Sequence, residues 1–429
     1  MTKNDTSKQP YYIILLLILA AEAVFILPFV LQRVFKPTFL EIFAINNENL
    51  GYCFSFYGVV ALFSYLFGGP LADKFQPKNL IATALILTAS GGLYFATFPE
   101  YSHLKYLYGY WGFTTIFLFW AAMIKATRIW GGNDKQGMAF GFLDGGRGLV
   151  AALFGTVGVL VFSFFIDVDI SETTLEDRRN AFKYVILTSS AIVAFIGLLV
   201  FFFLKPNQSS SEVTSEKKSI SFSDFGMILQ HRAVWLLMLI VLCAYVGYKT
   251  TDFFTLYTKD VMGYDDIKSA KVGTYLLYMR PIIGVVIGLM ADRTKASLWL
   301  IIGFVFMLAS SLVFASGIIT EGDTLLFVIG VIAMAIGVYS CRVLYFATLE
   351  EAKIPVALTG TTVGLVSIVG YTPDIFQGPM FGILLDNDNK PLGLQHAYLL
   401  LAVFSIIGLI TSYLFYKHNN KTINSLDAS

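Results

Sequence analysis

Twelve long apolar stretches, separated by short polar gaps, constrain the fold of this chain more than any other feature. They cover residues 11–34, 50–72, 78–99, 104–129, 137–166, 181–204, 233–258, 268–290, 297–319, 324–349, 357–385 and 395–416. A helix needs about 20 residues to cross the apolar core of a bilayer, and each stretch reaches that length. The sequence therefore predicts an all-α membrane protein with twelve transmembrane helices.

The composition agrees with a membrane location. Of the 429 residues, 56% are hydrophobic and 14% are charged, whereas soluble proteins carry about 25% charged residues. The net charge of +1 gives no indication of a nucleic-acid partner. Cys53, Cys243 and Cys341 all lie inside apolar stretches, which argues against a disulfide framework or a thiolate metal site. The first apolar run is too long for a cleaved signal peptide, so we interpret it as a retained helix.

The longest interior polar stretch, 205–232, is rich in serine and charge, as is typical of a flexible linker. It predicts two six-helix bundles, residues 1–204 and 233–429, joined by a linker at 205–232. An even number of spans places both termini on one side of the membrane. More Lys and Arg residues fall on that side than on the other, so the positive-inside rule predicts cytoplasmic termini and a cytoplasmic linker.

A short motif recurs at the same place in each half of the chain. Gly69-Pro70-Leu71-Ala72-Asp73-Lys74 ends the second apolar stretch, and Gly288-Leu289-Met290-Ala291-Asp292-Arg293 ends the eighth. The two copies lie about half a chain apart, on either side of the predicted linker. This placement indicates a duplicated fold.

Twelve spans, a central polar loop and the repeated motif resemble the major facilitator superfamily over essentially the whole chain. The resemblance implies two pseudo-symmetric six-helix bundles that rock around a central cavity and give alternating access. It also implies that the motif residues form a clasp between helices that holds one conformation; these residues are Gly69, Asp73, Gly288, Asp292 and Arg293. The family motif usually continues with a glycine and further basic residues, whereas here Asp73 is followed by Lys74, Phe75, Gln76, Pro77 and Lys78.

A narrower resemblance is carried by Lys125, by residues 136–142 and 144–148, and by the segments around Arg342, Glu351 and Thr359. These residues look like the bacterial YihN-like branch of inner-membrane proteins. That branch is related to the organophosphate antiporters and to the nitrate/nitrite carriers, which grip anions with membrane-buried arginines. The resemblance implies a multi-pass protein of the cell inner (cytoplasmic) membrane whose substrate is an anion.

Eight charged residues fall inside the apolar stretches: Glu22, Asp144, Arg147, Lys249, Asp252, Arg280, Arg342 and Asp374. A charge at bilayer depth costs about 2.5–3.5 kcal/mol on insertion scales, so it normally has a partner or a function. Asp144 and Arg147, like Lys249 and Asp252, are three residues apart and share a helix face. Each pair is either a self-neutralising structural pair or part of a functional site, and Lys249–Asp252 could contribute to an outer gate.

Arg280 and Arg342 have no carboxylate near them in their own helices. An arginine facing a wet cavity is a good ligand for phosphate, sulfonate or carboxylate. The alternative is a salt bridge across the bundle to Glu22 or Asp374. We predict Arg147, Arg280, Arg342 and Lys249 as substrate-binding residues. Glu22 and Asp374 are predicted to couple transport to protons, with a static salt bridge as the alternative role.

The sequence therefore predicts a secondary active transporter of a small organic anion, by proton symport or by antiport against a counter-anion. The alternative is a proton symporter of a neutral or zwitterionic nutrient such as a sugar or short peptide, in which every buried arginine would be salt-bridged. A receptor or scaffold on a transporter fold is a third possibility. The sequence contains no Walker A motif, nucleophile–base pair or metal-ligand cluster, so we expect no enzyme activity, cofactor or metal.

Overall fold

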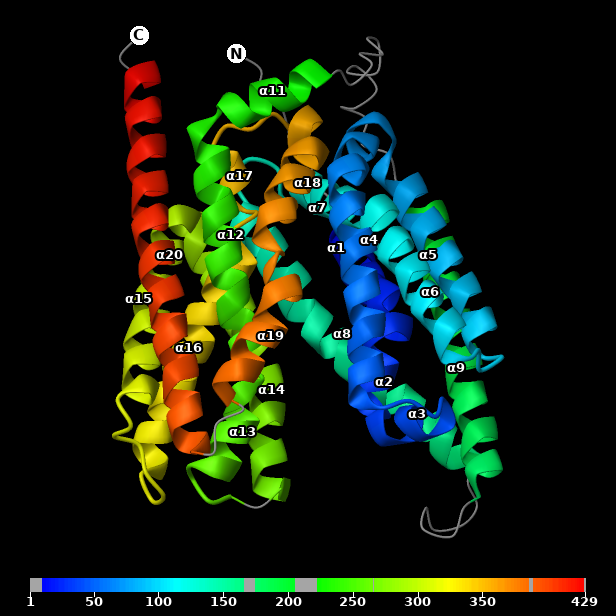
Figure 1. Ribbon diagram of the computed structural model, residues 1–429. Coiled ribbons are helices and arrows are strands. Elements are labelled where there is room, and N and C mark those ends of the chain that lie inside the picture. Colours follow the sequence, from blue (N-terminus) through cyan, green and yellow to red (C-terminus); the bar gives the residue numbers. More distant parts are fainter. Residues whose placement is uncertain (1–9, 166–173, 205–221, 265, 386–388, 428–429) are drawn as a thin grey trace.

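The computed structural model describes residues 10–165, 174–204, 222–264, 266–385 and 389–427, and its architecture is helical (Figure 1). Within these residues, ten helical segments are long and apolar enough to cross a membrane. Two further helices, α5 (Pro77–Phe95) and α14 (Asp266–Arg293), pack among them. All twelve predicted apolar stretches lie on helices, so the prediction of an all-α membrane protein is confirmed.

The first half of the chain forms α1 (Tyr11–Phe25), η1 (Ile26–Val30), α2 (Leu31–Val34), α3 (Lys36–Ile42), α4 (Asn47–Lys74), α5, α6 (Tyr101–Gly112), η2 (Phe113–Trp120), α7 (Ala121–Gly131), α8 (Gln136–Phe164) and α9 (Leu175–Phe203). Side-chain hydrogen bonds cap the first turns of α4 and α9. The Asn46 side chain accepts from the Asn49 N–H at 2.8 Å, and Thr174 and Asp177 form a capping box at α9.

The second half forms α11 (Phe222–Gln230), α12 (Arg232–Thr250), α13 (Phe253–Asp260), α14, α15 (Ala296–Ala315), α16 (Thr324–Leu344), α17 (Thr348–Glu351), η3 (Val356–Leu358), α18 (Thr359–Gly370), α19 (Pro373–Leu385) and α20 (Lys390–Asp427). The last part of the predicted linker is therefore helical, in α11. Residues 205–221 of that linker lie outside the described residues.

Three of the predicted spans are interrupted in the structure. The stretch 324–349 breaks near its end, where residues 345–347 form a turn between α16 and α17. The stretch 233–258 breaks after α12, where the Thr251 hydroxyl donates to the Tyr248 carbonyl at 2.6 Å and competes with the helical hydrogen bonds. The stretch 357–385 breaks between α18 and α19, directly before Pro373. The proline ring disfavours the helical conformation of the residue that precedes it. The breaks after α12 and before α19 place irregular backbone inside predicted spans, which is tolerated at membrane depth where it is buried in protein or lines a water-filled cavity.

Helices from the two halves lean together at the end that carries both termini and spread apart at the other end (Figure 1). The close contacts between the halves are α8 against α14 and α4 against α18. Glycines permit these crossings: a Cβ on Gly69 would collide with the carbonyl oxygen of Gly360, and a Cβ on Gly288 would collide with that of Gly137. The fold therefore closes one end and leaves the other end open.

Candidate functional site

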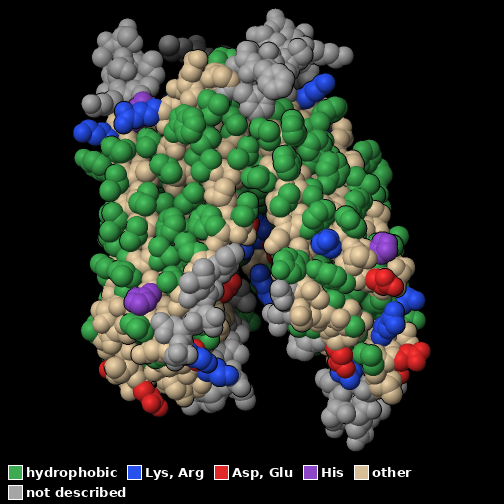
Figure 2. Space-filling model, viewed as in Figure 1, with side chains coloured by type: hydrophobic (Ala, Val, Ile, Leu, Met, Phe, Trp, Pro, Cys, Tyr) green, Lys and Arg blue, Asp and Glu red, His purple; other side chains and the backbone are tan. Residues whose placement is uncertain are grey.

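A cleft runs between the two halves and opens at the end away from the termini. Figure 2 shows this hollow, with acidic and basic side chains along its walls beneath an otherwise hydrophobic surface. The charged residues come from α1, α8, α12, α14, α16 and α19. Seven of the eight charges predicted from the sequence, all except Asp252, form the salt bridges described below.

Asp144 on α8 stands at the centre of this group, and two arginines from the other half bind it. Arg280 on α14 donates from Nε to Oδ2 at 3.1 Å and from Nη2 to Oδ1 at 2.6 Å. Arg342 on α16 donates from Nε to Oδ1 at 3.1 Å. The three side chains are 8–11% exposed. One carboxylate faces two guanidinium groups, which leaves an excess of one positive charge in this triad.

The Arg342 side chain has unused hydrogen-bonding capacity. Its guanidinium carbon lies 3.7 Å from the ring centroid of Tyr248, in a cation–π arrangement. Its Nη1 atom is buried and has no hydrogen-bond partner. A buried donor left unsatisfied costs about 1–3 kcal/mol, so a hydrogen-bond acceptor that reached this atom would offset that cost.

Arg147 is bound to the first helix rather than to its neighbour in sequence. Its Nε donates to Glu22 on α1 at 3.0 Å, and its guanidinium lies 5.3 Å from the Phe25 ring. The self-neutralising Asp144–Arg147 pair considered from the sequence is not formed. Spacing three places both residues on one face, but the neighbouring helices offer each of them a better-placed partner.

Lys249 and Asp374 form a third charged group, which is nearer to solvent. Their Nζ and Oδ1 atoms are 2.7 Å apart, and the side chains are 39% and 37% exposed. The Tyr245 hydroxyl donates to both carboxylate oxygens of Asp374, at 3.0 and 3.2 Å. Lys249 therefore pairs with Asp374 and not with Asp252, because α12 ends between Lys249 and Asp252. Asp374 lies in the first turn of α19, not in the middle of a continuous span.

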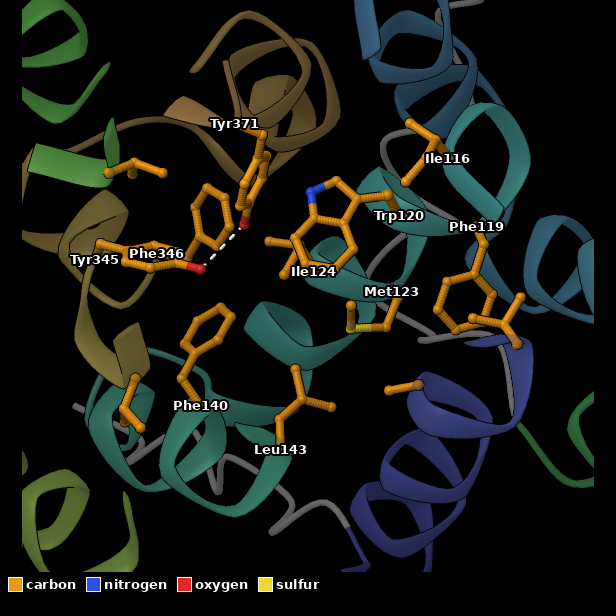
Figure 3. Close-up of a cluster of buried hydrophobic side chains, with 14 of the residues drawn as sticks. Ile116, Phe119, Trp120, Met123, Ile124, Phe140, Leu143, Tyr345, Phe346 and Tyr371 are labelled. Carbon is orange, nitrogen blue, oxygen red and sulfur yellow. Dashed lines mark hydrogen bonds between the residues drawn. The ribbon is translucent and has the colours of Figure 1, made fainter. Parts of the chain in front are cut away.

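Figure 3 shows a cluster of buried side chains, whose aromatic members we call the aromatic seal: Trp120, Phe140, Tyr345, Phe346 and Tyr371. The hydroxyls of Tyr345 and Tyr371 are hydrogen-bonded at 3.0 Å, and the Trp120 and Tyr371 rings are 5.5 Å apart. Tyr345 follows Arg342 by about one helical turn. The cleft therefore ends at a packed aromatic layer that lies about one helical turn from the charged triad, on the side of the chain termini.

Beyond the seal, the two copies of the repeated motif join the halves. Asp73 accepts from the backbone N–H groups of Gly360 and Thr361 at the start of α18, both at 2.7 Å. Asp292 accepts from those of Gly137 and Met138 at the start of α8, at 2.7 and 2.8 Å. Each carboxylate thus binds free N–H groups at the positive end of a helix from the other half.

Lys125 contacts the first motif copy and Arg293 belongs to the second, and the two residues differ in burial. Lys125 is buried, and its Nζ lies 3.5 Å from Asp73 Oδ1 while it donates to the Ala72 carbonyl at 3.0 Å. Its ammonium group is therefore held inside the protein and does not extend to the membrane surface, as a lysine near the end of a span commonly does. Arg293, predicted as part of the clasp, is exposed.

Arg128 is a residue whose importance sequence reasoning missed. It is almost fully buried and binds the second half through the Thr359 hydroxyl at 2.8 Å and Glu350 Oε2 at 2.9 Å. In the sequence it lies near the end of the apolar stretch 104–129, where a charged side chain commonly extends to the membrane surface. The one sequence feature that pointed to Arg128 was its position three residues after Lys125, which places both side chains on one helix face.

Comparisons with known proteins agree with this architecture. A sequence profile of the Major Facilitator Superfamily matches residues 13–377. The Inner membrane protein YqcE of Escherichia coli (strain K12) is 24% identical over 393 residues, which cover 90% of each chain. The Inner membrane protein YihN of the same organism is 24% identical over 419 residues, 96% of each chain.

Among solved structures, the transporter FucP in its outward conformation superposes with a TM-score of 0.73 at 17% sequence identity. The match covers 93% of this chain and 97% of FucP. The solved structure shows the same fold, and the resemblance to YihN is confirmed. The family profile identifies a multi-pass membrane transporter of a small molecule rather than an enzyme. Because the family profile spans most of the chain, the protein belongs to the major facilitator superfamily.

Proposed function

We propose that this transporter moves a small organic anion that bears a phosphate, sulfonate or carboxylate group. The observation that carries the proposal is the triad, in which Arg280 and Arg342 share the single carboxylate of Asp144. An anion would supply the missing negative charge and an acceptor for the unpartnered Arg342 Nη1. Arginine is suited to this role because its planar guanidinium group can donate two parallel charge-assisted hydrogen bonds to one anionic group.

The transport cycle follows from alternating access between two bundles, residues 1–204 and 233–429. With cytoplasmic termini, the cleft faces the outside and the clasps close the cytoplasmic end. A substrate bound at the triad contacts α8 of one bundle and α14 and α16 of the other. It must stabilise the occluded state more than the open states, because only differential affinity shifts a conformational equilibrium.

The two remaining ion pairs are the proposed coupling sites. Glu22 holds Arg147 deep in the cleft, with 11% exposure of both side chains, while the Asp374–Lys249 pair is reached by solvent. Protonation of either carboxylate would release its cation for the substrate. Alternatively, the transported anion exchanges against a counter-anion that takes the same cations.

The second candidate function is proton symport of a neutral or zwitterionic nutrient such as a sugar or short peptide. It is favoured by the carboxylate partners of Arg147 and Lys249, which leave these two cations already neutralised. FucP is itself a fucose:proton symporter. The two candidates differ in whether the excess positive charge of the triad is used by the substrate.

Thermal unfolding of the purified protein with a panel of ligands separates these candidates. The panel contains sugar phosphates, sulfonates, carboxylates, neutral sugars and short peptides, and hits are carried into liposome uptake at two pH values. We expect an anion to stabilise the wild type and Arg342→Gln to weaken its apparent affinity at least about tenfold, or about 1.4 kcal/mol. Arg178→Gln is the matched control, because Arg178 pairs with Glu41 away from the cleft.

Asp144→Asn sharpens the same experiment. It keeps the size of the side chain but removes the charge that competes for both arginines, so an anionic substrate should bind more tightly to this variant. A neutral sugar or peptide that stabilises the wild type and Arg342→Gln equally, with no gain from Asp144→Asn, would overturn the anion proposal.

A further inference from the structure

In addition to the central cleft, the protein has a separate cavity of about 810 Å³. It is formed by the C-terminal end of α5 and the segment that follows it, by the end of α3, and by the first three turns of α9. Both α5 and α9 reach this region at the end of the molecule away from the termini (Figure 1). The cavity contains none of the residues assigned above to transport.

The wall contributed by α9 changes from polar to apolar along one face. Five residues of this face line the cavity: Glu176, Arg179, Asn180, Lys183 and Leu187. Each is three or four residues from another of the set, so they lie on one side of the helix. The apolar stretch predicted from the sequence begins at residue 181. The face therefore passes from the water-exposed end of the helix into the depth of the membrane within about three turns.

The opposite wall continues this gradient. Leu93 on α5, an apolar side chain inside the predicted stretch 78–99, is 59% exposed. Phe98 lies beyond the end of α5, and its ring centroid is 4.8 Å from the Arg179 guanidinium. Figure 2 shows acidic and basic side chains gathered at this end of the molecule, where the hydrophobic surface ends. The cavity thus has a cationic rim and an apolar floor at the membrane–water boundary.

We propose that this cavity binds an anionic phospholipid. Arg179 and Lys183 stand one helical turn apart and would hold the phosphodiester between them, while the acyl chains extend along Leu187 and Leu93. Glu176 at the outer rim limits the ligand to a single negative charge, and Asn180 offers hydrogen bonds to a hydroxyl-bearing head group. Phosphatidylglycerol has this chemistry, with one charge, a glycerol head group and two acyl chains.

The test uses the full chain, purified in detergent and stripped of lipid. Thermal unfolding is followed during titration with phosphatidylglycerol or with phosphatidylcholine of the same acyl chains, and native mass spectrometry measures the lipid that remains bound. We expect phosphatidylglycerol to raise the Tm and to be retained, and phosphatidylcholine to do neither. The Arg179→Gln/Lys183→Gln double variant should weaken apparent phosphatidylglycerol affinity at least about tenfold.

Lys105→Gln is the matched control, because Lys105 lies in the same half but does not line the cavity, and it should respond as the wild type does. Arg179→Lys keeps the charge and should keep the lipid preference even if the double variant is less stable. Equal responses to the two lipids, an unchanged response of the double variant, or a loss in Arg179→Lys as large as in the double variant would each overturn the proposal. Stabilisation by glycerol 3-phosphate as strong as that by phosphatidylglycerol would also overturn it, since the site would then be one for a soluble phosphate.

Discussion

The two copies of the repeated motif bind the opposite half of the molecule in the same way but with unequal support. Both Asp73 and Asp292 accept two backbone N–H groups at the start of a helix. Asp73 also accepts from the Thr361 hydroxyl at 2.7 Å and lies 3.5 Å from the Lys125 ammonium. The Asp73 clasp is therefore a buried ionic network, whereas the Asp292 clasp rests chiefly on the helix terminus.

This difference separates the contacts that both clasps make from the contacts that only the Asp73 clasp makes. The shared part is geometric: glycines bring the helices together, and a carboxylate then reaches the free N–H groups of the opposing helix. The added part depends on α7, which supplies Lys125 to the first clasp. Arg128, also on α7, ties the same helix to Thr359, the first residue of α18. The α4–α7–α18 junction should therefore contribute more to closure than the α8–α14 junction.

The largest effect is expected from Asp73→Ala. It removes three hydrogen bonds and leaves the buried Lys125 ammonium without its carboxylate, and breaking a buried ion pair in this way costs about 3–5 kcal/mol. Thermal unfolding in detergent should show a marked fall in Tm. Maleimide labelling of a cysteine introduced at Leu143, next to the aromatic seal, should rise as the closed end opens. Adding Lys125→Met should recover part of the loss, and a double variant no more stable than Asp73→Ala would contradict the ionic network.

Gly69→Ala and Gly288→Ala test the part that both clasps share. A Cβ at either position would collide with a backbone carbonyl of the opposing helix, and overpacking of this kind costs about 1–3 kcal/mol. We expect similar falls in Tm for the two variants. Gly58→Ala is the control, because a Cβ there meets no atom within 4 Å. Two falls that differed as strongly as those of the aspartate variants would show that the crossings are not equivalent.

Asp292→Ala should have a smaller effect than Asp73→Ala. It leaves the N–H groups of Gly137 and Met138 without their carboxylate but strands no buried cation, so the expected cost is about 1–3 kcal/mol. The comparison is made by Tm and by labelling of the same introduced cysteine. A loss equal to that of Asp73→Ala would show that Lys125 adds nothing to the first clasp.

Thr361→Val should give the smallest effect in this series. It removes the hydroxyl that donates to Asp73 but keeps the Thr361 backbone N–H bond, so a loss of about 1 kcal/mol is expected. The change is measured by Tm beside Thr156→Val, a control whose hydroxyl bonds only within its own exposed helix face. A loss as large as that of Asp73→Ala would place the strength of the clasp in the hydroxyl instead of the ion pair.

The sequence by itself determined the helical membrane fold, the repeated motif and the identity of the buried charges. Length and hydropathy fix a membrane helix because its backbone must be satisfied internally, so local pattern and structure coincide. Asp73 and Asp292 could likewise be singled out, because the duplicated motif is a property of the linear chain.

Only the tertiary structure decided which charges meet. Spacing along a helix gives the face on which Asp144 lies but not the helix that packs against that face, and its partners Arg280 and Arg342 are more than a hundred residues away. The same limit hid the role of Arg128, whose acceptors all lie in the other half. The physical reason is that a salt bridge depends on distances of a few ångströms between side chains, and in this chain those distances are set by how the two halves pack together.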